Sequence, residues 1–266
     1  MMKTKTIIDF IEMKKNNEKI SVITCYDYSF ARIVEKSSVD MILVGDSAGM
    51  VFAGYDSTIP VTMEEMIYHS KSVRRGTSKF IVADMPFMSY QTSDRDGLIN
   101  AGRLLKEGGA NAVKIEGGFS TAPLIRKITD ASIPVMGHIG LQPQSVNMTG
   151  GYKVQGKNPK DAQRIIEEAK ILEQAGVYSI VVELVVEDVA RKVSESVSVP
   201  VIGIGAGRFT DGQVLVINDM LGADSSYQRK YLKKYADMES LVLGALNEYS
   251  SDVKDEKFPS EENSFI

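Results

Sequence analysis

The chain has 266 residues, of which 43% are hydrophobic and 25% charged, which is enough apolar material for one large core or two small ones. Its formal net charge of -4 excludes the basic footprint of a nucleic-acid-binding domain. Cys25 is the only cysteine, no apolar run approaches the roughly 20 residues of a membrane-spanning helix, and the N-terminus carries no leader pattern, so we expect a cytoplasmic protein without disulfides or membrane contact.

Short apolar runs rich in β-branched residues alternate with amphipathic stretches along the chain. In order the runs are ISVITC (20–25), DMILVG (40–45), KFIVAD (79–84), NAVKIE (111–116), IPVMGH (133–138), YSIVVE (178–183), VPVIGIG (199–205) and a weaker QVLVIN (213–218). Helix signals lie between them: Thr62 with Glu65 has the spacing of a capping box, Asn158 precedes a proline, and Gly176 stands at an expected helix end. Eight strand–helix repeats predict parallel pairing and fit a closed (β/α)8 TIM barrel better than an open sheet.

We expect a single barrel domain over residues 1–266, because no linker rich in Pro, Gly or Ser divides the chain. An additional helix is predicted before the first strand, from Thr4 to Lys14, and further helices after the eighth, over 227–249. A short polar tail is expected from about Ser250.

Polar side chains stand at or just beyond the ends of five successive predicted strands. They are Asp46, Asp84, Lys114, Glu116, His138 and Glu183. In a parallel barrel all strand C-termini lie on one face, where active sites are built. Because alternate residues of a strand share a side, Lys114 and Glu116 are both predicted to point into the barrel interior near its open end.

The chemistry of this set favours a hard cation and a proton-transfer reaction. Three carboxylates without a Cys/His cluster favour Mg²⁺ over Zn²⁺, with Asp46 and Asp84 as direct ligands and Glu116 acting through water. Such an ion would chelate a 2-oxo acid and stabilise its enolate. Glu183, tuned by burial, is the candidate base. The candidate substrate-binding residues are Ser47, Asp84, Lys114 and His138.

Each of these residues also has a purely structural interpretation. Asp46 and Asp84 lie where an Asx turn or a helix cap would explain them. Lys114 and Glu116 would also serve as an ion pair closing the barrel top, and His138 as a core histidine. Their convergence on one face favours the functional interpretation over separate coincidences.

Two glycine-rich stretches and one histidine indicate a function less strongly than the residues at the strand ends do. The stretch GIGAGRFTDGQ (203–213) lacks the spacing of a dinucleotide-binding motif. The stretch TGGYKVQGK (149–157) is either a lid that excludes water from the site or an ordinary surface loop. His69 lies inside the helix that follows Thr62, where a packing or surface role is expected.

Several long motifs in order resemble the ketopantoate hydroxymethyltransferase family. They are LVGDSAGM (43–50), VADMPFMSY (82–90), GANAVKIEGG (109–118), GHIGLQPQSVN (137–147), GGYKVQGK (150–157) and PVIGIGAGRFTDGQVLV (200–216). The resemblance implies a barrel of the phosphoenolpyruvate/pyruvate type that depends on Mg²⁺. It also implies transfer of a one-carbon unit from 5,10-methylenetetrahydrofolate to 3-methyl-2-oxobutanoate, giving 2-dehydropantoate and tetrahydrofolate in the first committed step of pantothenate biosynthesis.

The resemblance assigns roles to residues at matching positions. It places Asp46 and Ser47 in the GDS motif, Asp84 in ADxPF, Lys114 and Glu116 in KIEGG, His138 in the GH-GL motif, and the general base at Glu183. After Glu183 the chain reads LVVED, where relatives often have a Cys-Val-Pro run.

The family implies a homo-oligomer, a decamer or an octamer. Two other functions remain open from the residues themselves: a Mg²⁺-dependent lyase that acts on C–C bonds of another 2-oxo acid, and a non-catalytic barrel that binds metabolites. The lyase-type barrels generally use a cysteine in a mobile loop, for which Cys25 at the end of the first strand is poorly placed.

Overall fold

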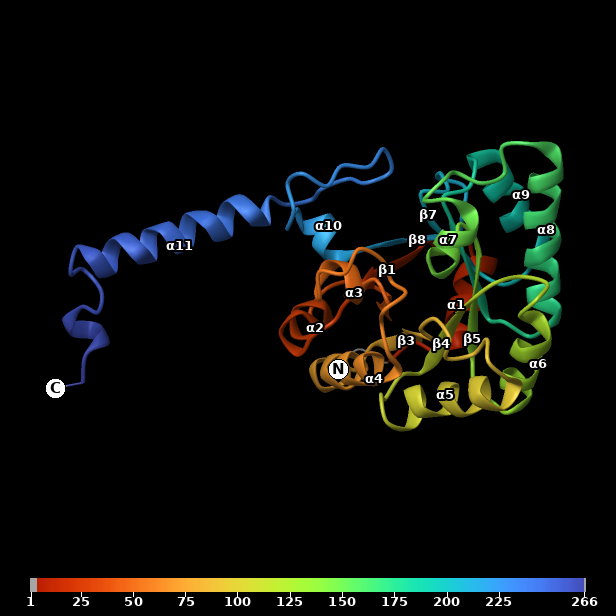
Figure 1. Ribbon diagram of the computed structural model, residues 1–266, viewed down its shortest axis with the longest axis horizontal. Coiled ribbons are helices and arrows are strands. Elements are labelled where there is room, and N and C mark those ends of the chain that lie inside the picture. The colour runs from red at the N-terminus through yellow and green to blue at the C-terminus, as the bar shows by residue number, and fades with distance from the viewer. Residues whose placement is uncertain (1–3, 266) are drawn as a thin grey trace. The chain divides into compact units, whose positions relative to one another are not determined.

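The computed structural model describes residues 4–265, and its central feature is a closed parallel barrel (Figure 1). The eight strands pair in chain order, and the last pairs with the first. They are β1 (Ile20–Thr24), β2 (Met41–Val44), β3 (Phe80–Asp84), β4 (Ala112–Glu116), β5 (Val135–Gly140), β6 (Ser179–Glu183), β7 (Val201–Ile204) and β8 (Gly212–Leu215). The predicted (β/α)8 architecture is confirmed, and each strand lies within or overlaps its predicted run.

Helices connect the strands and lie outside them (Figure 1). They are α2 (Tyr28–Glu35), α3 (Ala48–Val51), α4 (Met63–Gly76), α5 (Asp94–Lys106), α6 (Ala122–Asp130), the short η1 (Pro143–Ser145) and α7 (Val146–Thr149), α8 (Pro159–Gln174) and α9 (Glu187–Ser196). The predicted caps form: the Thr62 hydroxyl accepts a hydrogen bond from the Glu65 N–H at 3.2 Å, and the Asn158 side chain accepts one from the Asp161 N–H at 2.9 Å. Gly176 follows α8 with φ +95°, which glycine adopts without strain.

The barrel interior is apolar except at its open end. Phe80 and Val82 of β3 and Ala112 of β4 belong to one buried cluster, and the next inward positions along these strands are polar. Helix α1 (Ile7–Lys15) closes the other end, where Phe10 is fully buried and stacks edge-on against Phe80 at 5.3 Å. Among residues 4–265, the charged groups of the barrel interior are therefore gathered at this end.

The chain divides into two compact units between Val216 and Ile217. The second contains α10 (Ile217–Leu221), α11 (Met238–Lys254) and η2 (Glu261–Asn263). The prediction of helix over 227–249 is wrong in its first part, because α11 begins only after Asp237, whose side chain caps it by accepting a hydrogen bond from the Ser240 N–H at 3.2 Å. The expected polar tail from Ser250 begins inside this helix. Within residues 4–265 no helix is both long and apolar enough to cross a membrane.

Candidate active site

The C-terminal ends of β2 to β6 bring the predicted polar residues together at the mouth of the barrel. The strand register places Asp84 beside Lys114, Glu116 beside His138, and Gly140 beside Glu183. The buried members are Asp46, Asp84, Lys114, Glu116 and His138, each at most 5% exposed. The Glu183 side chain is 18% exposed, so this carboxylate lies where the buried cluster meets the opening.

A line of polar contacts runs across the mouth from Asp84 to Glu183. The Lys114 ammonium lies 3.1 Å from Asp84 Oδ1 and 3.1 Å from His138 Nδ1. An ammonium only donates hydrogen bonds, so Nδ1 accepts and the ring proton of a neutral His138 is on Nε2. That nitrogen lies 3.3 Å from Glu183 Oε2. The order of contacts is therefore carboxylate, ammonium, neutral imidazole, carboxylate.

The electrostatics of this line fix which groups carry charge. Burial and the neighbouring Lys114 ammonium hold the pKa of His138 well below its ordinary value, so the imidazole is neutral. Burial alone would lower the pKa of Lys114, but the Asp84 and Glu116 carboxylates raise it above its ordinary value, so the amine stays protonated. Burial raises the pKa of Glu183 to about 7, although Lys114 opposes the shift. A carboxylate with this pKa is suited to take a proton at neutral pH.

Two further carboxylates, those of Asp46 and Glu116, also interact electrostatically with Lys114. The Asp46 N–H donates to Asp84 Oδ2 at 3.0 Å, which holds the two residues together. Burial, followed by the Asp84 charge, raises the pKa of Asp46, and burial raises the pKa of Glu116. Buried charges are costly unless they are paired, and one ammonium cannot balance four carboxylates. The cluster is thus a site of excess negative potential.

Two carboxylate oxygens of this cluster, Asp84 Oδ1 and Glu116 Oε1, are buried without a hydrogen-bond donor, although the first has the Lys114 ion pair. Within residues 4–265 no three His, Cys, Asp or Glu side chains are grouped closely enough to hold a metal ion among them. The uncommitted oxygens are hard donors, and they would suit a hard cation that takes one or two direct carboxylates and completes its shell with water or substrate oxygens. They do not form a closed cage of protein ligands.

The sequence reasoning missed two groups that hold the site. Gln144, in the segment after β5, is 4% exposed and donates from Nε2 to Asp46 Oδ2 at 2.8 Å. The Tyr26 hydroxyl lies 2.9 Å from Ser47 Oγ. A search for carboxylates, lysines and histidines at strand ends passes over both a glutamine and a tyrosine. The signal for Gln144 is the motif GHIGLQPQSVN, and the signal for Tyr26 is the family-like stretch TCYDYSFA (24–31).

The position of the candidate base depends on its backbone neighbours. Gly140 has φ +88°, and a Cβ at this position would lie 2.4 Å from the Glu183 carbonyl oxygen. Only glycine lets β5 and β6 approach this closely. Leu184, in the segment that departs from the family pattern, has φ +46°, and its carbonyl accepts from the Gln155 N–H at 2.7 Å. The loop over 149–157 is thus attached directly after the base.

His69 and Cys25 are buried outside the line of contacts that runs from Asp84 to Glu183. His69 is buried in α4, and its Nδ1 lies 2.7 Å from the Tyr26 carbonyl oxygen, as expected for a packing role. Cys25 is fully buried, and burial raises the pKa of its thiol to about 11. This thiol stays protonated at neutral pH, which argues against a thiolate nucleophile at this position.

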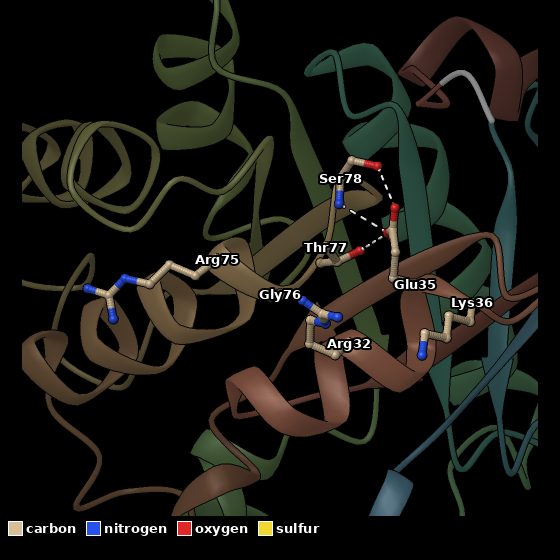
Figure 2. A pocket seen from close by; sticks show the side chains of 7 residues that line it. All are labelled: Arg32, Glu35, Lys36, Arg75, Gly76, Thr77 and Ser78. Carbon is tan, nitrogen blue, oxygen red and sulfur yellow. Dashed lines mark hydrogen bonds between the residues drawn. The ribbon is translucent and has the colours of Figure 1, made fainter. Parts of the chain in front are cut away.

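A hollow on the outside of the barrel lies where α2 and α4 end and the chain leads into the start of β3 (Figure 2). It is lined by Arg32, Glu35, Lys36, Arg75, Gly76, Thr77 and Ser78. These residues belong to the last turns of α2 and α4 and to the segment leading into β3. The Glu35 carboxylate at its centre accepts hydrogen bonds from the Thr77 and Ser78 hydroxyls and from the Ser78 N–H. It therefore ties two helix ends together and is separate from the candidate active site.

The fold and its mouth define a closed (β/α)8 barrel. A 2,3-dimethylmalate lyase, itself a member of the phosphoenolpyruvate mutase/isocitrate lyase superfamily, superimposes with a TM-score of 0.59 and 15% identity, covering 97% of this chain and 91% of the other. A phosphonopyruvate hydrolase, crystallised with oxalate and Mg²⁺, gives a TM-score of 0.62 and 12% identity over 97% and 93% of the two chains. At these identities the likeness concerns the fold alone.

Sequence comparison identifies the family. Residues 4–261 match the ketopantoate hydroxymethyltransferase family. The 3-methyl-2-oxobutanoate hydroxymethyltransferase of Geobacter metallireducens is 53% identical over 266 residues, which is 100% of both chains. That of Carboxydothermus hydrogenoformans is 54% identical over 261 residues, covering 98% of this chain and 95% of its own. The chain belongs to the ketopantoate hydroxymethyltransferase family and is a transferase.

The buried Glu183 carboxylate predicts a pH-dependent stability difference. Because the folded-state pKa of about 7 lies above the ordinary value of 4.5, the folded protein holds this proton more tightly, and the resulting stability is lost as the pH rises through 7. Glu183→Gln does not titrate. Relative to the metal-free wild type, its free energy of unfolding should rise by about 3 kcal/mol between about pH 4 and pH 8.

Urea unfolding of both metal-free proteins at the two pH values measures this difference. Glu195→Gln, an exposed change on α9, is the control and should show a much smaller dependence. A Glu183→Gln difference that does not change with pH would show that the wild-type carboxyl has an ordinary pKa.

Proposed function

We propose that this chain transfers a hydroxymethyl group to 3-methyl-2-oxobutanoate, giving 2-dehydropantoate for pantothenate biosynthesis. Membership of the family supports the reaction, and the observation that supports the chemistry is the placement of Glu183. Its carboxylate is next to a neutral imidazole and across from a permanently charged ammonium, at the opening of a buried polar cluster. This is the arrangement required to remove a proton from a carbon beside a carbonyl and to hold the resulting negative charge.

The residues divide into a base and groups that bind the acid. Glu183 takes the proton from C3, and the electron pair of the broken C–H bond moves toward the carbonyl oxygen to form an enolate. The Lys114 ammonium and the Nε2–H of His138 supply positive charge and a hydrogen-bond donor to the 2-oxo acid. Ser47, whose hydroxyl is oriented by Tyr26, is placed to donate to the substrate carboxylate. Burial of these groups strengthens each interaction, because little water competes.

We propose Mg²⁺ as the metal, held directly by Asp46 and Asp84, with Glu116 acting through a bound water. The excess negative charge and the underused oxygens of this cluster support a hard divalent cation. When bound, such an ion polarises the carbonyl oxygen of a 2-oxo acid and favours ionisation at the adjacent carbon. Without a cation, the cluster buries several carboxylates around one lysine.

We propose 5,10-methylenetetrahydrofolate as the cosubstrate. The C3 carbon of the enolate attacks the one-carbon unit and forms the new C–C bond, tetrahydrofolate leaves with the electrons of the broken C–N bonds, and water supplies the hydroxyl oxygen of the product. We propose that the loop over 149–157 covers the mouth during this step, which the hydrogen bond from the Gln155 N–H to the Leu184 carbonyl oxygen supports.

The central test separates binding from proton removal. Glu183→Gln keeps the volume and polarity of the side chain but is not basic. We expect turnover to fall by about 10²–10⁴-fold while the affinity for 3-methyl-2-oxobutanoate changes little. Steady-state kinetics and calorimetric titration measure the two quantities, with Glu187→Gln on α9 as the matched control. Unchanged turnover would remove Glu183 as the base.

Substitution of Asp84 tests the proposed metal site. Asp84→Asn keeps an oxygen acceptor for the Asp46 N–H but removes one negative charge beside Lys114. We expect the affinity for Mg²⁺ and the metal-dependent affinity for the 2-oxo acid to weaken together, by about 10-fold or more. Calorimetry on the metal-free protein provides both values. Wild-type affinity for both ligands would show that Asp84 is not a ligand.

We also propose that the chain forms a homo-oligomer through α11, with a decamer or octamer expected from the family. This 17-residue helix has no buried residue. Val242, Leu246, Tyr249 and Val253 recur at alternating steps of four and three, with exposed fractions of 44–60%. This spacing places them in one stripe, as on a helix that packs against another helix. A second copy of the chain offers the same stripe, so a symmetric pairing would cover both.

Substitution within the stripe tests the oligomer. Leu246→Asp should shift the mass measured by sedimentation equilibrium toward the monomer, because the charge would be buried at the interface. Asn247→Asp adds the same charge at the adjacent exposed position and should keep the wild-type mass. Equal masses for all three proteins would contradict this use of α11, and a monomeric wild type would contradict the homo-oligomer itself.

A further inference from the structure

Gln144 connects the two sides of the carboxylate cluster. Its side-chain Nε2 donates to Asp46 Oδ2 at 2.8 Å and to the Met85 carbonyl oxygen at 2.9 Å. Its Oε1 lies 2.8 Å from the Tyr90 hydroxyl and 3.3 Å from Gln91 Nε2, both of which can donate. Every polar atom of the side chain is therefore used, in a residue that is 4% exposed.

These partners fix the orientation of the amide. Two acceptors surround the nitrogen and two donors surround the oxygen, so an amide rotated by half a turn would oppose like groups on both sides. An amide held in this way cannot rotate to meet a substrate without losing four contacts. Its role therefore concerns the protein groups around it rather than direct contact with the reacting atoms.

The backbone of the same residue holds the second carboxylate. The Gln144 N–H donates to Glu116 Oε2 at 3.0 Å. In the described part of the chain, Asp46 Oδ1 receives no hydrogen bond, and Glu116 Oε1 is buried without a donor. One residue thus occupies one oxygen on each of two carboxylates and leaves the other oxygen of each uncommitted.

We propose that Gln144 is a positioning residue for the cation site. Its amide and its N–H orient Asp46 and Glu116, so that each presents its second oxygen to a shared cation or to a water on it. The inference rests on the proposed metal site and adds the group that preorganises it. Groups that hold metal ligands in this way commonly contribute 10–100-fold to metal affinity.

The test uses Mn²⁺ binding by the substrate-free protein, followed by electron paramagnetic resonance of the free ion. Gln144→Met keeps the length of the side chain and the backbone donor but removes the amide. We expect its Mn²⁺ affinity to fall by about 10–100-fold. Tyr90→Phe removes one donor to Gln144 Oε1 and should lower the affinity by a smaller factor. Gln142→Met, two residues away and with no side-chain hydrogen bond among the described residues, should bind as the wild type does.

Thermal unfolding of each metal-free variant separates positioning from folding. A merely structural role would lower the melting temperature of Gln144→Met but leave Mn²⁺ affinity within about twofold of wild type, and this outcome would overturn the inference alone. If Gln144→Met does not fold, Tyr90→Phe decides in the same way. A wild type that binds no Mn²⁺ would overturn both the metal proposal and this inference.

Discussion

The burial of three carboxylates around a single lysine, with a fourth at the opening of the barrel mouth, is the constraint on which the rest of the site depends. A charge removed from water is stable only where a partner or hydrogen bonds replace the lost hydration. Lys114 neutralises part of the negative charge, since its ammonium lies 3.1 Å from Asp84 Oδ1 and keeps its proton although it is buried. Burial, and after it the charges of neighbouring carboxylates, raises the pKa of Asp46 and Glu116, so a cation bound beside them would stabilise their ionised forms. The clustered charges lower the stability of the folded protein at the proposed active site.

The barrel makes this concentration of charge possible. Alternation along β3, β4 and β5 directs every second side chain inward, and the register sets neighbouring strands so that polar positions fall at one level. Below that level the inward positions are apolar, and Phe10 of α1 is buried at the far end, so among residues 4–265 the polar cluster faces the mouth. Glu183, on the adjacent strand β6, lies at that opening and completes the line of contacts that begins at Asp84. A substrate that enters the mouth would therefore meet the proposed base before the buried carboxylates.

Strand-end residues were predictable from the sequence because period-two alternation and parallel closure both have strict geometric consequences. Asp84, Lys114, Glu116 and His138 all lie where this reasoning placed them. Gln144 was not predictable, because its importance comes from hydrogen bonds made by a loop whose path no periodicity specifies. The tautomer of His138 also required the structure, since it depends on the 3.1 Å contact with Lys114. The prediction of a helix over 227–249 is wrong in its first half. The apolar and basic pattern of a helix already begins at residue 227, but α11 starts only after its N-cap, Asp237.

The measurement that tests this account most directly follows the C3 proton of 3-methyl-2-oxobutanoate by NMR in D₂O. The purified protein is supplied first with Mg²⁺ and then with excess chelator, and tetrahydrofolate is added if exchange is slow. The account predicts a loss of the C3 proton signal that depends on the metal and on Glu183. If no exchange occurs under any of these conditions while the protein remains folded, the proposed enolisation of this acid is contradicted, and the barrel acts on another 2-oxo acid or on none.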